Sequence, residues 1–190
     1  MATTNQSSLP EMVAQSREIM RSPSVSAFER YERHGNMTSA AIYVGVAALI
    51  AAVLGLVGGF GGFISGLLLA LVQFFVFTGM VYLLGKNMYQ GTGTWDEVSY
   101  SFSLFTAPLI VIGALVNFIV VLFSWVPVIN LLVGAVGFFV SIALLLVQVY
   151  YANLAVQSSM NLRTQSQAII VLVLSFVATF VISLLVGGIF

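Results

Sequence analysis

The sequence contains no cysteine, a single histidine and very little charge. Of its 190 residues, six are Lys or Arg and six are Asp or Glu, so the net charge is zero. The lack of cysteine excludes disulfides, zinc–thiolate sites and palmitoylation. The single His34 excludes a multi-histidine metal cluster. The zero net charge argues against nucleic acid as a partner.

Hydrophobic residues, in contrast, make up 60% of the chain, and its mean hydropathy is +1.09. A soluble domain has about 25% charged residues, whereas only 6% of these residues are charged. Because so few charged side chains cannot cover a surface in water, the composition predicts an integral membrane protein.

Five apolar runs are long enough to cross a bilayer as helices, which takes about 20 residues each. None of the runs contains Lys, Arg, Asp, Glu or His. They are continuously apolar rather than alternating, which disfavours a transmembrane barrel. We therefore predict an all-α polytopic protein, with a polar, amphipathic arm over residues 1–36 and a five-helix transmembrane domain over 37–190. The spans are expected at about 38–58, 62–85, 99–123, 129–156 and 167–190.

The charged residues all lie before the first run or in the connections after the second and fourth runs. The connections on the other side, residues 57–62 and 124–130, carry no charge. Lys and Arg in short loops remain on the cytosolic side of a membrane. This pattern predicts a cytosolic N-terminus and a C-terminus outside.

The arm contains two possible helix starts, at residues 8–11 and at Ser22-Pro23. Short apolar stripes with charged residues opposite them follow both starts. They are typical of an interfacial amphipathic helix that lies on the lipid headgroups. An arm that binds a partner protein is an alternative, and the two interpretations are compatible.

Several short motifs indicate local structure rather than chemistry. Residues 94–97 and 164–167 each begin with Thr and end with Glu or Gln, as capping boxes do. Gly91-Thr92-Gly93 follows a helical run and lacks the Lys-Ser/Thr of a phosphate-binding loop, so we interpret it as a flexible turn. Small residues at four-residue spacing predict close packing of the first two spans, or else a dimer face. They are Ala47, Ala51, Gly55 and Gly59, with Gly58, Gly62 and Gly66.

Three amides interrupt the spans: Gln73, Asn117 and Gln148. We expect them to form hydrogen bonds between helices, worth roughly 0.6 kcal/mol each on average; a polar path through the bundle is the alternative. The lack of ionisable groups inside the spans argues against proton relays and ion pumps. Pro108 is expected to kink the third span, because proline removes one backbone hydrogen bond.

Several of these features occur in the order typical of a known family. Phe28-Glu29-Arg30 follows Pro23, a Gly-rich connection joins the first two spans, and residues 91–98 precede the span that contains Pro108. From about residue 23 to its end, the chain resembles the Yip family of five-span, Ypt/Rab-interacting membrane proteins, especially the short prokaryotic members.

The resemblance implies a cytosolic N-terminus, in agreement with the charge pattern. It also implies the bacterial cytoplasmic membrane for a prokaryotic chain, or the Golgi or endoplasmic-reticulum membrane for a eukaryotic one. Eukaryotic members bind prenylated Rab GTPases. This chain lacks their long N-terminal region and their Asp-Leu-Tyr-Gly-Pro-type motif, so Rab binding is not carried over.

These observations predict a non-enzymatic scaffold or adaptor of the Yip type, which acts through its cytosolic face in membrane organisation or trafficking. We expect no catalytic residue, cofactor or metal. The expected partners are lipids and other membrane or membrane-associated proteins, including a second copy. Alternatives are an accessory subunit of a larger membrane complex and a small transporter or channel. Candidate cytosolic contacts are Arg17, Arg21, Phe28, Arg30, Arg33, Lys86, Trp95 and Arg163.

Overall fold

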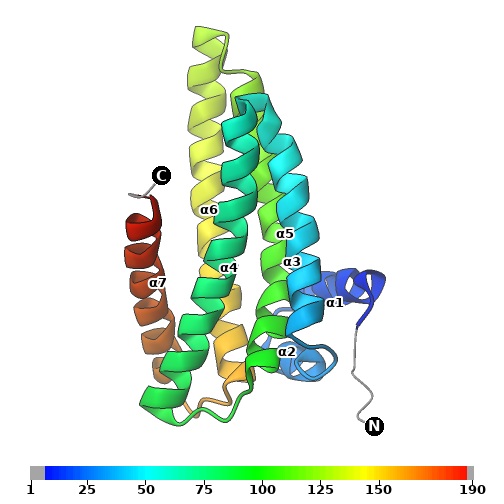
Figure 1. Ribbon diagram of the computed structural model, residues 1–190, viewed down its shortest axis with the longest axis vertical. Helices are drawn as coiled ribbons and strands as arrows, with labels where there is room; N and C mark the ends of the chain where they lie inside the picture. Colours follow the sequence, from blue (N-terminus) through cyan, green and yellow to red (C-terminus); the bar gives the residue numbers. More distant parts are fainter. Residues whose placement is uncertain (1–6, 188–190) are drawn as a thin grey trace.

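The computed structural model describes residues 7–187, with side chains over 7–184, and this part of the chain is helical (Figure 1). Five of the helices, α3 to α7, are long and apolar enough to cross a membrane. The predicted all-α, five-span architecture is therefore confirmed. In chain order the elements are α1 (Leu9–Arg21), α2 (Val25–Tyr31), α3 (Met37–Gly55), the 3-10 turn η1 (Leu56–Gly58), α4 (Phe60–Tyr89), α5 (Trp95–Leu122), α6 (Pro127–Ser159) and α7 (Gln165–Gly187).

The spans form a bundle with two different ends (Figure 1). Helices α1 and α2 lie beside the bundle near one end, the end that has the α4–α5 and α6–α7 connections. We call this the charged end, because all Lys, Arg, Asp and Glu residues occur in these segments, directly after α2, or in the adjoining turns of α4 and α5. The opposite end, with the α3–α4 and α5–α6 connections, we call the apolar end. Which end faces the cytosol stays a prediction.

Polar caps set where several helices begin. The capping box of α5 is confirmed: the Thr94 amide donates to Glu97 Oε2 (2.8 Å), and the Glu97 amide donates to Thr94 Oγ1 (3.2 Å). The box expected for α7 is only half formed, with the Gln167 amide donating to Thr164 Oγ1 (3.4 Å). Helix α2 begins two residues later than expected. Its cap is Ser24, whose hydroxyl accepts from the Ala27 amide.

The spans differ in length. Helix α6 has 33 residues and is about 50 Å long, well beyond the roughly 30 Å of a hydrocarbon core. Helix α7 has 23 residues, or about 35 Å, and stops short of the apolar end (Figure 1). Helix α5 continues through Pro108 without a break in its assignment, and the expected kink there stays a prediction.

Helix α3 packs mainly against α5 and α4, α6 packs against α5, and α7 packs against α4 and α6. The α3–α4 contact is very close. A Cβ atom on Gly62 would lie 2.2 Å from the Gly55 carbonyl oxygen, and one on Gly66 would lie 3.2 Å from Ala52 Cα. The small-residue stripes therefore serve packing within the chain. Gly59, with φ of +88°, makes the turn between the two helices.

Candidate functional site

The N-terminal arm packs into the charged end of the bundle. Met12, Ser16 and Ile19, spaced at i, i+4 and i+7 on α1, are buried. Val13, on another face of the same helix, is 55% exposed. The expectation that the apolar stripe of this helix lies on headgroups is therefore wrong for its central residues, because α5 and α3 cover them.

Tyrosines from three different spans hold the arm in place. Each contributes its hydroxyl to a hydrogen bond with α1, so the helix is tied to α3, α5 and α6 at once. The bonds join Tyr43 to the Ser16 hydroxyl (3.0 Å), Tyr100 to Gln15 Oε1 (2.7 Å) and Tyr151 to the Met20 carbonyl (3.0 Å).

Phe28 anchors α2 in the same way, through its ring. It is fully buried and lies edge-on to Phe105, with ring centroids 6.1 Å apart. Phe105 in turn stacks on Tyr151, at 5.9 Å. The prediction that Phe28 contacts a partner is therefore wrong, since the side chain points into the core rather than out of α2.

A small charged cluster joins the arm to α5 and α6. Glu32 is 4% exposed and accepts a hydrogen bond from the Ser158 hydroxyl (2.7 Å). Arg33 Nε lies 3.2 Å from Glu97 Oε1 and 3.8 Å from Glu32 Oε1. Burial is the largest effect on the pKa of Glu32 and raises it, and the negative charges of Glu97 and Glu29 raise it further. The hydrogen bond from Ser158 and the positive charge of Arg33 lower this pKa, but the net shift is upward. Glu32 and Ser158 are 126 residues apart, so no sequence pattern links them.

The glycines of the α4–α5 connection form a tightly packed segment. Gly91 and Gly93 are buried against the end of α6. A Cβ atom on Gly93 would lie 1.8 Å from the Ser159 carbonyl oxygen, and one on Gly91 would lie 2.6 Å from Met160 Cε. The interpretation of residues 91–93 as a flexible turn is therefore wrong. Glycine is required here because two backbones touch.

Some candidate contact residues are engaged within the protein. Arg30 pairs with Glu18 of α1. Lys86 Nζ lies 3.1 Å from the Tyr82 hydroxyl and 5.0 Å from the centre of its ring. Trp95 lies edge-on to the same ring at 5.6 Å. These side chains, like Arg33, contribute to the packing of the charged end.

Arg17, Arg21 and Arg163 are exposed and form no ion pair within the described residues. Arg17 and Arg21 are one turn apart on α1, and therefore share one face of that helix. Arg163 lies in the α6–α7 connection. Of the predicted contact residues, these three are the most available to an anionic partner.

The intramembrane amides do not behave as expected. Gln73, Asn117 and Gln148 are all exposed, and none has a hydrogen bond in the described part of the chain. The predicted interhelical bonds are therefore not present. Gln73 and Asn117 line a common groove, whereas Gln148 lies outside it, so the three do not form one polar path. Within residues 7–187, no cluster of His, Asp and Glu is placed to bind a metal.

No curated protein and no solved structure matches this chain. The family model of the Yip1 domain, in contrast, matches residues 17–187. The matched segment includes all five spans, the buried Phe28, the Glu32 cluster and the tightly packed glycines at 91 and 93. This integral membrane protein therefore belongs to the Yip1 domain family.

Proposed function

We propose that the protein is a non-enzymatic membrane scaffold or adaptor that acts through its charged end in membrane organisation or trafficking. The observation that supports this most directly is the docking of the arm. Because tyrosines of three spans hold α1, the helix that carries the exposed side chains has a fixed position. A fixed surface loses little conformational entropy when it binds a partner.

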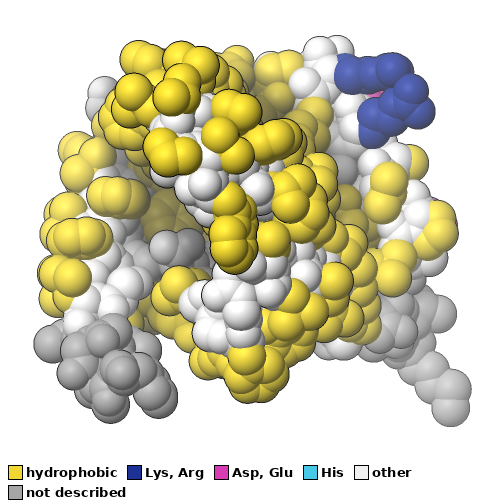
Figure 2. All heavy atoms as spheres, turned by 90° about the horizontal axis from the view of Figure 1, so that it is seen from above, with side chains coloured by type: hydrophobic (Ala, Val, Ile, Leu, Met, Phe, Trp, Pro, Cys, Tyr) yellow, Lys and Arg dark blue, Asp and Glu magenta, His cyan; other side chains and the backbone are white. Residues whose placement is uncertain are grey.

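The binding surface in this proposal consists of Arg17 and Arg21 on α1 and of Arg163, which lies just before the start of α7. Exposed arginines suit lipid phosphates and acidic protein segments, because the guanidinium group can form two parallel hydrogen bonds with either anion. The apolar end offers no such groups. Seen from that end (Figure 2), the surface is hydrophobic, and the visible Lys and Arg side chains gather at one edge, on the side of the N-terminal helices.

Arginine substitutions test this proposal better than deletion of the arm, which would uncover buried side chains. The double variant Arg17→Gln/Arg21→Gln is compared with Lys86→Gln, which removes a cation already in contact with Tyr82. Partners are recovered by crosslinking in cells. Recovery should fall at least fivefold for the double variant and stay at the parental level for Lys86→Gln. Equal recovery from both variants, at equal melting temperature, would refute the proposal.

The proposal also requires the charged end to face the cytosol. Because the chain has no cysteine, single cysteines at the exposed positions Ser124 and Ser166 provide unique labels. An impermeant thiol reagent should label position 124, but not 166, in intact cells. The reverse pattern would place the arginine surface outside.

A role as an accessory subunit of a larger membrane complex is the second candidate. It is favoured by α6, which exposes large apolar side chains along much of its length, including Leu131, Phe139 and Leu146. Such a face contacts either lipid or other helices. Purification in mild detergent separates the two cases. A stoichiometric co-purifying protein supports a subunit role, and a lone monomer or dimer contradicts it.

A further inference from the structure

The spans enclose a groove near the apolar end. It consists of two adjoining hollows, of about 600 and 220 Å³, that share Gly113 and Asn117 of α5. The larger hollow lies between α5 and the α3–α4 hairpin, and the smaller lies between α5 and α6. Walls of the groove include Gly62, Ser65 and Gly66 on one side, and Gly134, Gly137 and Phe138 on the other.

No described residue of α7 lines the groove. Helix α7 packs against both α4 and α6, but its described part ends well before the apolar end of these helices (Figure 1). Helices α4 and α6 hardly contact each other directly. From the apolar end, the surface is hollowed between α7 and the body of the bundle (Figure 2). The groove is therefore open sideways, toward the lipid.

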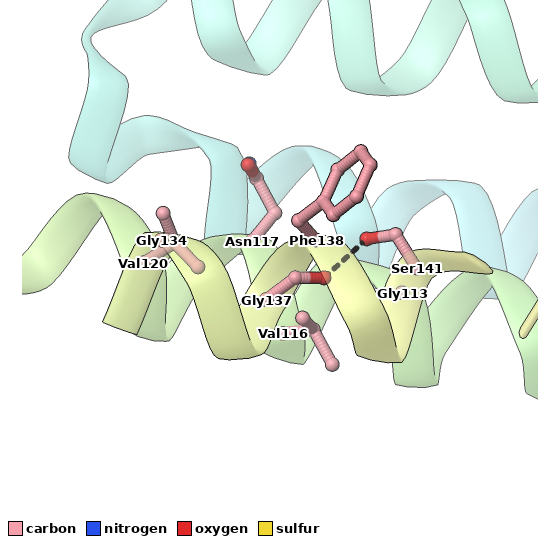
Figure 3. A pocket seen from close by; sticks show the side chains of 8 residues that line it. All are labelled: Gly113, Val116, Asn117, Val120, Gly134, Gly137, Phe138 and Ser141. Atoms are coloured by element: carbon pink, nitrogen blue, oxygen red, sulfur yellow. Dashed lines mark hydrogen bonds between the residues drawn. The ribbon is translucent and has the colours of Figure 1, made fainter. Parts of the chain in front are cut away.

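Asn117 is the polar group that the two hollows share. Its amide has no hydrogen bond. The side chains of Asn117 and Phe138 extend to the same side of the α5–α6 pair (Figure 3). Ser141, drawn beside them, already donates to the Gly137 carbonyl (2.8 Å). An amide carries two donor hydrogens and an acceptor oxygen, and leaving them unpaired in an apolar medium is costly. The groove therefore offers an unpaired amide to any occupant that has a hydrogen-bonding group.

The depth of Asn117 identifies that group. The apolar part of α5 begins at Val98, directly after Asp96 and Glu97. From Val98 to Asn117 the helix rises about 29 Å, which is close to the roughly 30 Å of a hydrocarbon core. Asn117 therefore lies at the far edge of the core, where the ester carbonyls of phospholipids are found. Trp125, eight residues further on, suits the headgroup layer.

We propose that the groove binds one phospholipid of the leaflet at the apolar end. The Asn117 amide donates to an ester carbonyl of this lipid, and one acyl chain lies along the glycine-lined wall. A second copy of the protein is a poorer occupant, because a two-fold axis would place this concave face against itself and leave a void. The binding site is independent of the charged end, so it does not depend on the scaffold function.

Glycine substitution tests whether the groove is occupied. A Cβ atom on Gly113 meets nothing within 4 Å, so Gly113→Leu should fill the groove without disturbing the backbone. Gly45→Leu is the matched control, because Gly45 of α3 is equally open and lines neither hollow. Asn117→Leu is paired with Gln148→Leu, which removes an unbonded amide outside the groove.

The measurement is native mass spectrometry of the full chain, purified in mild detergent and incubated with dioleoylphosphatidylglycerol. The parent, Gly45→Leu and Gln148→Leu should retain one lipid, whereas Gly113→Leu and Asn117→Leu should retain at least fivefold less. Equal retention by all five proteins would overturn the proposal. So would a lipid-free dimer that only the two groove variants abolish, because a second copy would then be the occupant.

The ester contact has its own test. A dialkyl ether phosphatidylglycerol has the same headgroup and chains but no ester carbonyl. The parent should retain it less well than the diester lipid, and Asn117→Leu should not distinguish the two. Equal retention of both lipids by the parent would overturn the assigned hydrogen bond.

Discussion

The charged and apolar ends belong to one helix bundle, but they are packed differently. At the charged end, α1 and α2 close the bundle, tyrosine hydroxyls are paired, and a Cβ atom on Gly93 would collide with backbone. At the apolar end the helices separate around a groove, the Asn117 amide is unpaired and Gly113 faces open space. Apart from the α3–α4 hairpin, specific packing is thus concentrated at the charged end.

The difference has a physical basis. Within lipid, apolar side chains gain little by contacting each other rather than acyl chains, so close packing requires small residues or polar contacts. The α3–α4 hairpin has the small residues, and the charged end has the polar contacts. The outer parts of α5 and α6 also carry small residues, but Gly113 and Gly134 face open space rather than a neighbouring helix.

The largest expected effect comes from emptying the core of the charged end. Phe28→Ala should lower the free energy of unfolding by about 3–5 kcal/mol, because it leaves a cavity beside Phe105. Val13→Ala, on an exposed face of α1, should change it by less than about 0.5 kcal/mol. Thermal unfolding in detergent measures both. A small effect of Phe28→Ala would mean that the arm is not docked in solution.

Adding one methyl group at the charged end should be nearly as damaging. Gly93→Ala places a Cβ atom on the Ser159 carbonyl, so the two backbones must separate, at a cost of about 3 kcal/mol. The same assay should show a clear fall in melting temperature. If the melting temperature is unchanged, the α4–α5 connection does not rest on α6.

The charge of Glu32 gives a smaller effect that depends on pH. Burial raises the pKa of Glu32 above its ordinary value of 4.5, so the folded chain binds this proton more tightly than the unfolded chain does. The resulting stabilisation is present below pH 4.5 and is lost as the pH rises through the raised pKa. Glu32→Gln should therefore match the parent at pH 4 and be more stable at pH 8.

Melting temperatures from pH 4 to pH 8 measure this difference, with the exposed Glu29→Gln as control. A Glu32→Gln protein that is less stable than the parent at pH 8 would contradict the prediction. It would mean that the contact of Glu32 with Arg33, at 3.8 Å, outweighs the cost of burying the carboxylate.

The smallest effect comes from a methyl group at the apolar end. Gly113→Ala meets no atom within 4 Å and removes a flexible residue from a helix, so it should stabilise the protein by up to about 1 kcal/mol. The same glycine-to-alanine change is therefore expected to lower the stability of the protein at residue 93 and to raise it at residue 113. Equal destabilisation by both would remove the distinction between the two ends.

Features encoded locally could be predicted from the sequence. These features depend only on residues that are close together in the sequence, or on a single helical hairpin. They are the five apolar runs, the capping box at Thr94 and the small-residue contact between α3 and α4. The helices also extend past the apolar runs, as α4 does beyond Lys86 to Tyr89, because polar residues can continue a helix into the headgroup layer. The end of an apolar run therefore does not mark the end of a helix.

The candidate site was less predictable, because its contacts join distant residues. The apolar stripe of α1 suits a membrane surface and a protein groove equally well, and only Tyr43, Tyr100 and Tyr151 decide between them. Gly91 and Gly93 are as compatible with a free turn as with a buried one. The amides are the converse case: they are visible in the sequence, but no local pattern shows whether another helix offers them a partner.

The hydrogen bond between Met20 and Tyr151 spans 131 residues, and this constrains how the protein is made. Ribosomes add about 5–20 residues per second, so α1 emerges roughly 7 to 26 s before its partner on α6 exists. During the first part of that interval, before α3 and α5 are made, Met12, Ile19 and Phe28 also lack the helices that cover them in the folded chain. The bilayer surface is the apolar phase within reach, and the amphipathic pattern of α1 suits it. The amphipathic pattern of α1 therefore suits two surroundings in succession: the bilayer surface before the later spans exist, and the protein groove afterwards.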